Sequence, residues 1–138
     1  MMREILFRGK RIDNGEWVEG SLIVWPDGAT DICYSENDSF VEMMKTIVDP
    51  ASVGQYTGLT DKHGKKIFEG DILVFCKGAT YPYKVIWDGM GWKLIRADGT
   101  RIKEAFECNE IHYVNISEFI GNIHDNPELL GGASDGQD

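Results

Sequence analysis

The chain has 138 residues, of which 42% are hydrophobic and 27% charged, a composition typical of one globular domain or two small subdomains. Its 14 basic and 23 acidic residues give a formal net charge of −9, which disfavours broad binding to nucleic acid or to an anionic membrane. Sixteen glycines argue against long helices, and no apolar run is long enough to cross a membrane.

Cysteine usage and the N-terminal sequence indicate the compartment. The cysteines are odd in number and widely spaced, which fits reduced thiols better than a disulfide framework: Cys33, Cys76 and Cys108. The apolar stretch Ile5–Phe7 is too short for the core of a signal peptide. We therefore expect a soluble, cytoplasmic protein without membrane contact.

The first half of the chain is predicted to form short strands separated by turns. The strands are expected over residues 3–8, 16–25, 29–34 and 40–48, although the apolar residues of the last segment also fit a helical period. Asn14-Gly15 predicts a hairpin, and Gly20 predicts a bulge inside the second strand. Asp49-Pro50 predicts one helical turn with an aspartate cap.

A turn-rich stretch, Val53–Ile72, connects the two β-rich halves. Asp61–Gly64 predicts a tight turn, and Glu69–Asp71 predicts a second break before an apolar strand. Local turn chemistry accounts for the charged side chains of this stretch, so we interpret them as a solvated hairpin tip and as turn residues: Asp61, Lys62, Lys65, Lys66, Glu69 and Asp71.

The second half is predicted to be a meander of short strands joined by Asp-Gly turns. Strands are expected over residues 72–76, 81–87, 92–97 and 119–123, with further strand residues within 100–104 and 111–116. Asn126-Pro127 predicts a helical turn, and residues 131–138 predict a disordered acidic tail. A small closed or nearly closed barrel would remove the exposed edges of such a meander.

Three blocks of sequence resemble a known family. They are Arg3–Lys10 (REILFRGK) with Gly15–Gly20 (GEWVEG), then Asp49–Ile72 with its VGQYTGL and IFEGDI segments, and Phe119–Leu130 with FIGNI and NPELL. These blocks, in this order, resemble the YopX family, whose members are encoded mostly by bacteriophages and prophages of Gram-positive bacteria. The resemblance implies a phage or prophage origin, no established activity, and no functional residues.

The resemblance also implies a mostly β fold with an SH3-like small barrel in the second half. We therefore predict a mainly β chain with an N-terminal β-hairpin subdomain and linker over residues 1–69, an SH3-like barrel over 70–125, and short helical turns. Together they would form a single YopX-like domain over residues 1–130, followed by the tail.

Signatures of catalysis and of metal or nucleotide binding are missing from the sequence. Cys108 and His112 are four residues apart and His124 follows, but no paired-cysteine or zinc-protease motif accompanies them. No glycine-rich phosphate loop is present either. We therefore predict a protein that is not an enzyme and that carries no cofactor or metal.

Aromatic residues of the second half are the candidate binding site for a protein partner, of host or phage origin. They could line a shallow groove if exposed, although packing in a small core is the favoured interpretation of the two tryptophans: Tyr81, Tyr83, Trp87 and Trp92. Exposed edges in two small β subdomains would also allow a homo-oligomer.

Basic residues near the same tryptophans give an alternative, a small barrel that binds nucleic acid by charge and stacking. They flank the Asp98-Gly99 turn: Lys93, Arg96, Arg101 and Lys103. The net charge disfavours this alternative. Strand alternation would also place Lys93 on the face opposite to Trp92, where it would simply be a solvent-exposed charge.

Overall fold

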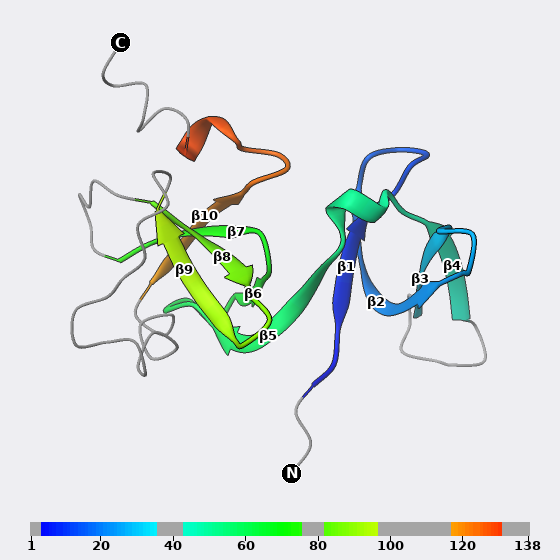
Figure 1. The fold of residues 1–138 in the computed structure, drawn as a ribbon, viewed down its shortest axis with the longest axis horizontal. Coiled ribbons are helices and arrows are strands. Elements are labelled where there is room, and N and C mark those ends of the chain that lie inside the picture. Colours follow the sequence, from blue (N-terminus) through cyan, green and yellow to red (C-terminus); the bar gives the residue numbers. More distant parts are fainter. Residues whose placement is uncertain (1–3, 36–42, 76–81, 97–116, 131–138) are drawn as a thin grey trace. The chain divides into compact units, whose positions relative to one another are not determined.

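The computed structural model describes residues 4–35, 43–75, 82–96 and 117–130 (Figure 1). The described chain is mainly β, as predicted, and divides between Tyr56 and Thr57 into two compact units. Residues 57–69, which the sequence grouped with the N-terminal subdomain, belong to the second unit. Within the described residues, no helix is both long and apolar enough to span a bilayer.

The first unit is an antiparallel meander in the sheet order β4-β3-β2-β1-β5. Its elements are β1 (Phe7–Lys10), β2 (Trp17–Val24), β3 (Thr30–Ser35), β4 (Met43–Ile47), the 3-10 turn η2 (Pro50–Ser52) and the start of β5 (Gly54–Thr60). The predicted strands over residues 16–25 and 29–34 are confirmed, and β4 shows that residues 43–47 adopt a strand rather than a helix.

Local chemistry builds the hairpin between β1 and β2. Gly15 has a φ of +75°, a left-handed conformation that glycine adopts without steric cost, and its N–H donates to the carbonyl of Arg11 at 3.0 Å. The side chain of Asn14 accepts a hydrogen bond from the N–H of Glu16 at 2.9 Å. The turn predicted at Asn14-Gly15 is therefore confirmed.

The first unit closes because β4 returns to β1. Val48 forms a β-bridge with Arg11, the N–H of Ile12 donates to the carbonyl of Ile47 at 3.2 Å, and that of Asp49 donates to Lys10 at 2.9 Å. The closure leaves no space for a side chain at β1, since a Cβ at Gly9 would lie 2.8 Å from a methyl group of Val48.

The 3-10 turn η2 then leads the chain along the edge of β1 that is not paired with β2. Asp49 caps this turn, as predicted, by accepting a hydrogen bond from Ala51 N–H at 3.0 Å. The hydroxyl of Ser52 accepts from Lys10 N–H at 2.8 Å and so ties the turn to β1. Directly afterwards Gly54 pairs with Arg8, which places β5 against β1.

The second unit contains a four-stranded antiparallel sheet in the order β10-β7-β8-β9, and β6 lies beside β5. Its strands are β6 (Lys66–Phe68), β7 (Asp71–Val74), β8 (Tyr83–Trp87), β9 (Trp92–Arg96) and β10 (Glu118–Asn122). The core consists of buried aliphatic side chains with a surround of partly buried ones: Ile67, Leu73, Val85 and Leu94, surrounded by Leu59, Phe75, Tyr83, Trp92 and Phe119.

Several expectations for the second half fall on residues outside the described ranges. They are the strand residues expected within 100–104 and 111–116 and the tail over 131–138. The SH3-like closure of residues 70–125 stays a prediction, because it depends on residues 97–116. The helical turn expected after Asn126-Pro127 is present at residues 128–130.

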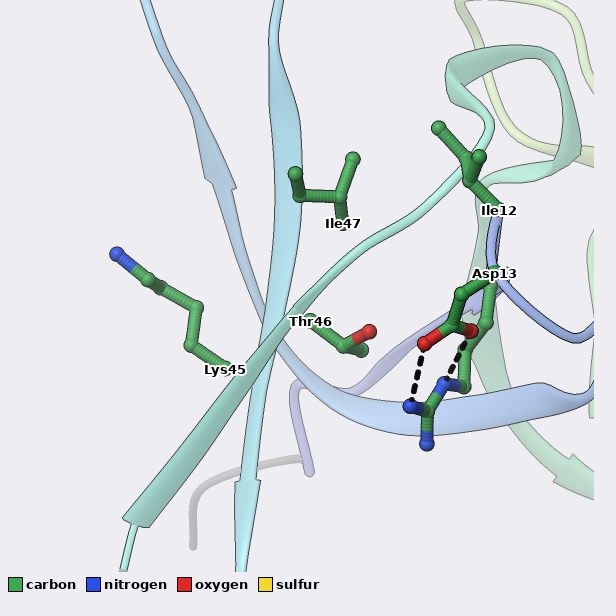
Figure 2. A pocket seen from close by; sticks show the side chains of 6 residues that line it. Ile12, Asp13, Lys45, Thr46 and Ile47 are labelled. Atoms are coloured by element: carbon green, nitrogen blue, oxygen red, sulfur yellow. Dashed lines mark hydrogen bonds and ion pairs between the residues drawn. The ribbon is translucent and has the colours of Figure 1, made fainter.

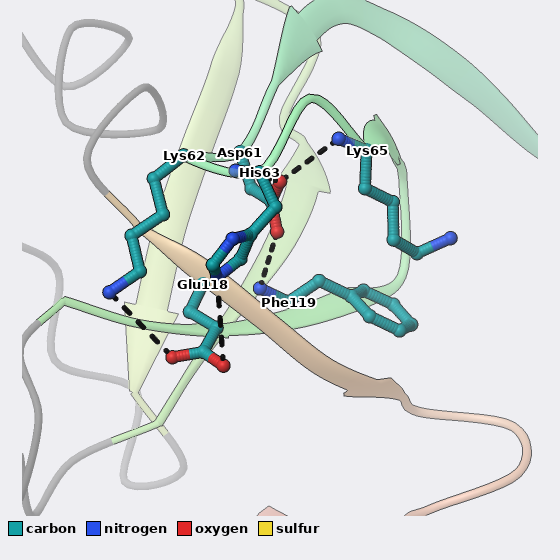
Figure 3. A network of polar contacts seen from close by, with 6 residues as sticks. All are labelled: Asp61, Lys62, His63, Lys65, Glu118 and Phe119. Atoms are coloured by element: carbon teal, nitrogen blue, oxygen red, sulfur yellow. Dashed lines mark hydrogen bonds and ion pairs between the residues drawn. The ribbon is translucent and has the colours of Figure 1, made fainter.

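The interpretation of Asp61 as a solvated residue at the tip of a turn is wrong, because the side chain is not solvated. Its side chain is buried, with 5% exposure, and lies at the centre of the network in Figure 3. Its Oδ1 accepts hydrogen bonds from the N–H groups of His63 at 2.8 Å and Lys65 at 3.0 Å. Its Oδ2 accepts from the N–H of Phe119 at 3.0 Å, so the same carboxylate closes a local turn and fastens β10 to it.

The side chains around this turn are exposed, as the interpretation required. The Lys62 ammonium lies 3.8 Å from one carboxylate oxygen of Glu118, and Nε2 of His63 lies 3.9 Å from the other. Surface ion pairs of this kind stabilise a fold by little, so the buried hydrogen bonds of Asp61 dominate the network.

Asp71 closes the turn before β7, as the sequence indicated, but its side chain is buried rather than solvent-exposed. It is fully buried at the start of β7, and its Oδ2 accepts a hydrogen bond from the N–H of Phe68 at 2.7 Å. Both corrections have one physical reason: strands this short leave N–H groups at their ends, and a buried carboxylate satisfies them.

The hydrogen bonds of Asp61 also set its acidity. Burial acts to raise the pKa of this carboxyl, but the N–H groups of Phe119, Lys65 and His63 together outweigh burial, so the pKa is lowered below its ordinary value. A lowered folded-state pKa means that the ionised side chain stabilises the folded chain at neutral pH.

We predict that Asp61→Ala lowers the free energy of unfolding by about 2 to 4 kcal/mol, because three N–H groups lose a charged acceptor. Urea denaturation followed by circular dichroism would measure this loss. Asp27→Ala is the matched control, since Asp27 is exposed and accepts one local bond from Ala29, and we expect it to cost under about 1 kcal/mol. Equal losses in the two variants would contradict the role assigned to Asp61.

A second prediction concerns the pH dependence of this stabilisation. Because the folded-state pKa lies below the unfolded value, the contribution is complete above the unfolded pKa of about 4 and disappears as the pH falls through the folded pKa. The difference in unfolding free energy between the natural chain and Asp61→Asn should be constant near neutral pH and shrink on acidification. A difference that grows below about pH 4 would show that the sign is reversed.

Candidate protein-binding surface

The hairpin formed by β8 and β9 carries all three aromatic candidates that the structure describes. In its register Val85 lies opposite Leu94, and Trp87 lies opposite Trp92 at the end next to the turn. Side chains alternate between the faces of a strand, so Trp87 and Trp92 share the face of the buried Val85 and Leu94. The hairpin therefore extends the core face of the sheet to its own tip.

The tip of this hairpin is held by a side chain. Oδ1 of Asp88 accepts hydrogen bonds from the N–H groups of Met90 at 2.9 Å and Gly91 at 3.1 Å. The N–H of Asp88 in turn donates to the carbonyl of Gly91 at 3.2 Å, and Gly89 adopts a φ of +92°. This fixed turn presents the side chain of Met90, which is 88% exposed.

The two tryptophans have different environments. Their rings meet edge to face, with centroids 5.1 Å apart and an interplanar angle of 66°. Trp92 is partly buried against the core cluster, whereas Trp87 is 51% exposed. Trp92 thus supports Trp87 from the core side, and Trp87 and Met90 together form an exposed apolar tip, which we call the hairpin tip.

The other aromatic candidates do not join the hairpin tip. Tyr83 is partly buried at the far end of β8, where its ring packs edge to face on Phe75 with centroids 5.3 Å apart. Tyr81 lies outside the described residues. The sequence interpretation missed Met90, since it assigned Gly89-Met90-Gly91 only to a turn. An apolar residue between two glycines of a hairpin turn has no strand neighbour to pack against, and that pattern could have identified it.

The basic candidates occupy two faces of the same hairpin. Lys93 lies opposite Ile86, on the face away from the tryptophans, as alternation predicted. Arg96 lies opposite Tyr83 and so belongs to the tryptophan face. Arg101 and Lys103 lie outside the described residues, so a nucleic-acid site built from all four stays a prediction.

The first unit contains a pocket of about 340 Å³ (Figure 2). The residues that line it come from the β1–β2 turn and from β4: Arg11, Ile12, Asp13, Lys45, Thr46 and Ile47. Arg11 donates two hydrogen bonds to the carboxylate of Asp13, at 3.0 and 2.9 Å, so these two charges satisfy each other. The pocket is thus lined by two isoleucines, Lys45, Thr46 and an ion pair whose two charges satisfy each other.

Metal-binding clusters do not occur in the described ranges. Among these residues, no group of three or more His, Cys, Asp or Glu side chains is placed to hold a metal ion. Cys108 and His112 lie outside them. The described chain therefore offers exposed apolar surfaces as its candidate sites.

Comparison with known proteins decides the family. The family model described as YopX protein matches residues 6–131. The chain belongs to the YopX family. The resemblance found in the three sequence blocks is thereby confirmed.

A solved structure is similar to this YopX-family chain. It is that of protein EF1440 from Enterococcus faecalis, with 22% sequence identity and a TM-score of 0.58. The match covers 94% of this chain and 99% of the other. At this identity the likeness concerns the fold alone. No curated protein matches the chain.

We predict that the two tryptophans of the hairpin differ in their effect on stability. Trp92→Ala should lower the free energy of unfolding by about 2 to 4 kcal/mol, because it leaves a cavity beside the core. Trp87→Ala should cost about 1 kcal/mol or less, because half of its surface is already in water. Urea denaturation of both variants checks this order, and a larger loss at Trp87 would contradict the assignment of Trp92 as the support.

Proposed function

We propose that this YopX-family chain is a non-enzymatic module that binds another protein, of host or phage origin, in the bacterial cytoplasm. The observation that supports the proposal is the hairpin tip, where Trp87 is 51% exposed and Met90 is 88% exposed. Large apolar side chains are costly to leave in water and are typical of binding hot spots.

The rigidity of the hairpin tip adds support. The Asp88 carboxylate fixes the turn through two hydrogen bonds, and the Trp92 ring fixes one side of Trp87. A preorganised surface loses little conformational entropy on binding, so more of the contact energy appears as affinity. Met90 adds a flexible, polarisable side chain that can fit an irregular partner surface.

A nucleic-acid partner is the competing function. Exposed Trp87 could stack on a base, and Lys93 and Arg96 would supply positive charge. The formal charge of −9 opposes this function, and Lys93 and Arg96 belong to opposite faces of the hairpin. A protein partner is therefore the better supported of the two.

Affinity capture of the full chain from lysate of a bacterial host, with and without nuclease, tests the proposal. We expect a protein partner that survives nuclease and that binds the double variant Trp87→Ala, Met90→Ala at least about tenfold more weakly. The matched control is Ile120→Ala, which removes an exposed apolar side chain from β10 in the same unit and should leave capture unchanged.

Two outcomes would overturn the proposal. Capture that disappears with nuclease and weakens with Lys93→Ala would favour the nucleic-acid function. A nuclease-resistant partner that binds the double variant as well as the natural chain would exclude the hairpin tip as the docking surface.

A further inference from the structure

Strand β4 is the outermost strand of its sheet, and its hydrogen-bonding pattern shows which of its backbone groups face outward. Val48 N–H donates to the carbonyl of Thr30, which makes these two a hydrogen-bonded pair of the β3–β4 ladder. Such pairs alternate along an antiparallel ladder. The N–H and C=O groups of Met43, Lys45 and Ile47 therefore point away from β3, towards the outer edge.

The contacts of Ile47 agree with this assignment, because its carbonyl accepts a hydrogen bond from Ile12 N–H across that edge. Met43 and Lys45 make no such bond to the described parts of the chain. Beyond Ile47 the β1–β2 turn diverges from β4, and the pocket of Figure 2 occupies the space between them. With respect to the described residues, the outer edge of β4 is thus covered at Ile47 and open at Met43 and Lys45.

Exposed apolar side chains surround this open edge. Met43, Met44 and Ile47 are all exposed on β4, and Ile12 is exposed across the pocket. A flat apolar edge with open backbone groups is a template for a further strand. An added strand would bury these side chains and satisfy the outward N–H and C=O groups at once.

The charge of the edge indicates what the added strand is. The chain has a formal net charge of −9, so two copies repel one another over most of their surfaces. β4 reads MMKTI, with one lysine and no acidic residue, so the strand itself adds nothing to the repulsion between two acidic copies. The Lys45 ammonium lies 4.0 Å from Asp31 of the neighbouring strand and is half exposed, so its charge remains accessible to a second copy.

We propose that β4 pairs with β4 of a second copy of this chain, antiparallel and with the two-fold axis at Met44. In this register Met43 of each copy exchanges both backbone hydrogen bonds with Lys45 of the other, so four bonds form between the outward groups. Met44 faces Met44 of the second copy. The proposal concerns the first unit and is independent of the hairpin tip in the second.

Neighbouring registers are excluded by charge and by an occupied carbonyl. An axis at Lys45 would place the two lysines directly opposite each other, which is unfavourable in a cross-strand pair. An axis at Thr46 would pair Lys45 with Ile47. That pair would need the carbonyl of Ile47, which already accepts a hydrogen bond from Ile12 N–H. The axis at Met44 alone pairs the open groups with each other and separates the lysines.

Substitutions at Met43 test this register by sedimentation equilibrium of the full chain over a range of concentrations. Met43→Glu would face Lys45 of the second copy and should tighten the dimer, whereas Met43→Lys would face the same lysine and should weaken it. We expect their dissociation constants to differ by about tenfold or more. Net charge alone predicts the opposite order, because the glutamate variant is more acidic, so that opposite order would overturn the proposal.

Disulfide formation tests the axis directly. Cα atoms of a non-hydrogen-bonded pair are about 4.5 Å apart, within the range that a disulfide spans. Met44→Cys should therefore form a covalent dimer under mild oxidation. Met43→Cys is the matched control and should not cross-link, since its partner position is Lys45; the natural chain gives the background from its own cysteines.

Two further results would overturn the proposal. A natural chain that remains monomeric at all concentrations, together with a Met44→Cys variant that does not cross-link, would mean that Lys45 keeps the edge unpaired. A dimer that is indifferent to both charges at Met43 would mean that copies associate through another surface.

Discussion

Short strands create more unpaired backbone groups at their ends than the sheets can satisfy, and the fold depends on carboxylates that supply the missing acceptors. Asp61 accepts three backbone hydrogen bonds from two segments that are distant in sequence, and Asp71 accepts one inside the second unit. Asp49 and Asp88 do the same for exposed turns. Part of the chain's negative charge therefore stabilises the fold by accepting backbone hydrogen bonds.

This use of charge explains where the two proposed binding surfaces occur. A turn fixed by a carboxylate does not need a packed side chain at its tip, so Met90 and Trp87 can remain exposed without loosening the hairpin. In the first unit, closure at Val48 satisfies one end of β4 and leaves the other end open. At the hairpin tip the backbone is satisfied and only side chains are exposed, whereas the open end of β4 presents exposed side chains together with backbone groups that have no hydrogen-bond partner among the described residues.

Sequence reasoning predicted the elements well, because turns and strand alternation are local. It identified the Asn14-Gly15 hairpin, the Asp49 cap and the strand character of β4. It could not identify the hydrogen bond that Phe119 N–H donates to Asp61, since no residue near Asp61 in the chain indicates that its carboxylate accepts from a strand 58 residues away. Nor could it separate Trp87 from Trp92, because both share one face and differ only in distance from the core.

The position of β1 has a consequence for the order in which the first unit can assemble on the ribosome. β2, β3 and β4 are joined by short-range pairings and can form as they emerge, but one edge of β1 has to wait for Val48 and for Gly54 and Gln55. Until then β1 stays half-paired. The first unit therefore becomes complete once residue 56 has emerged, before most of the second unit has been translated.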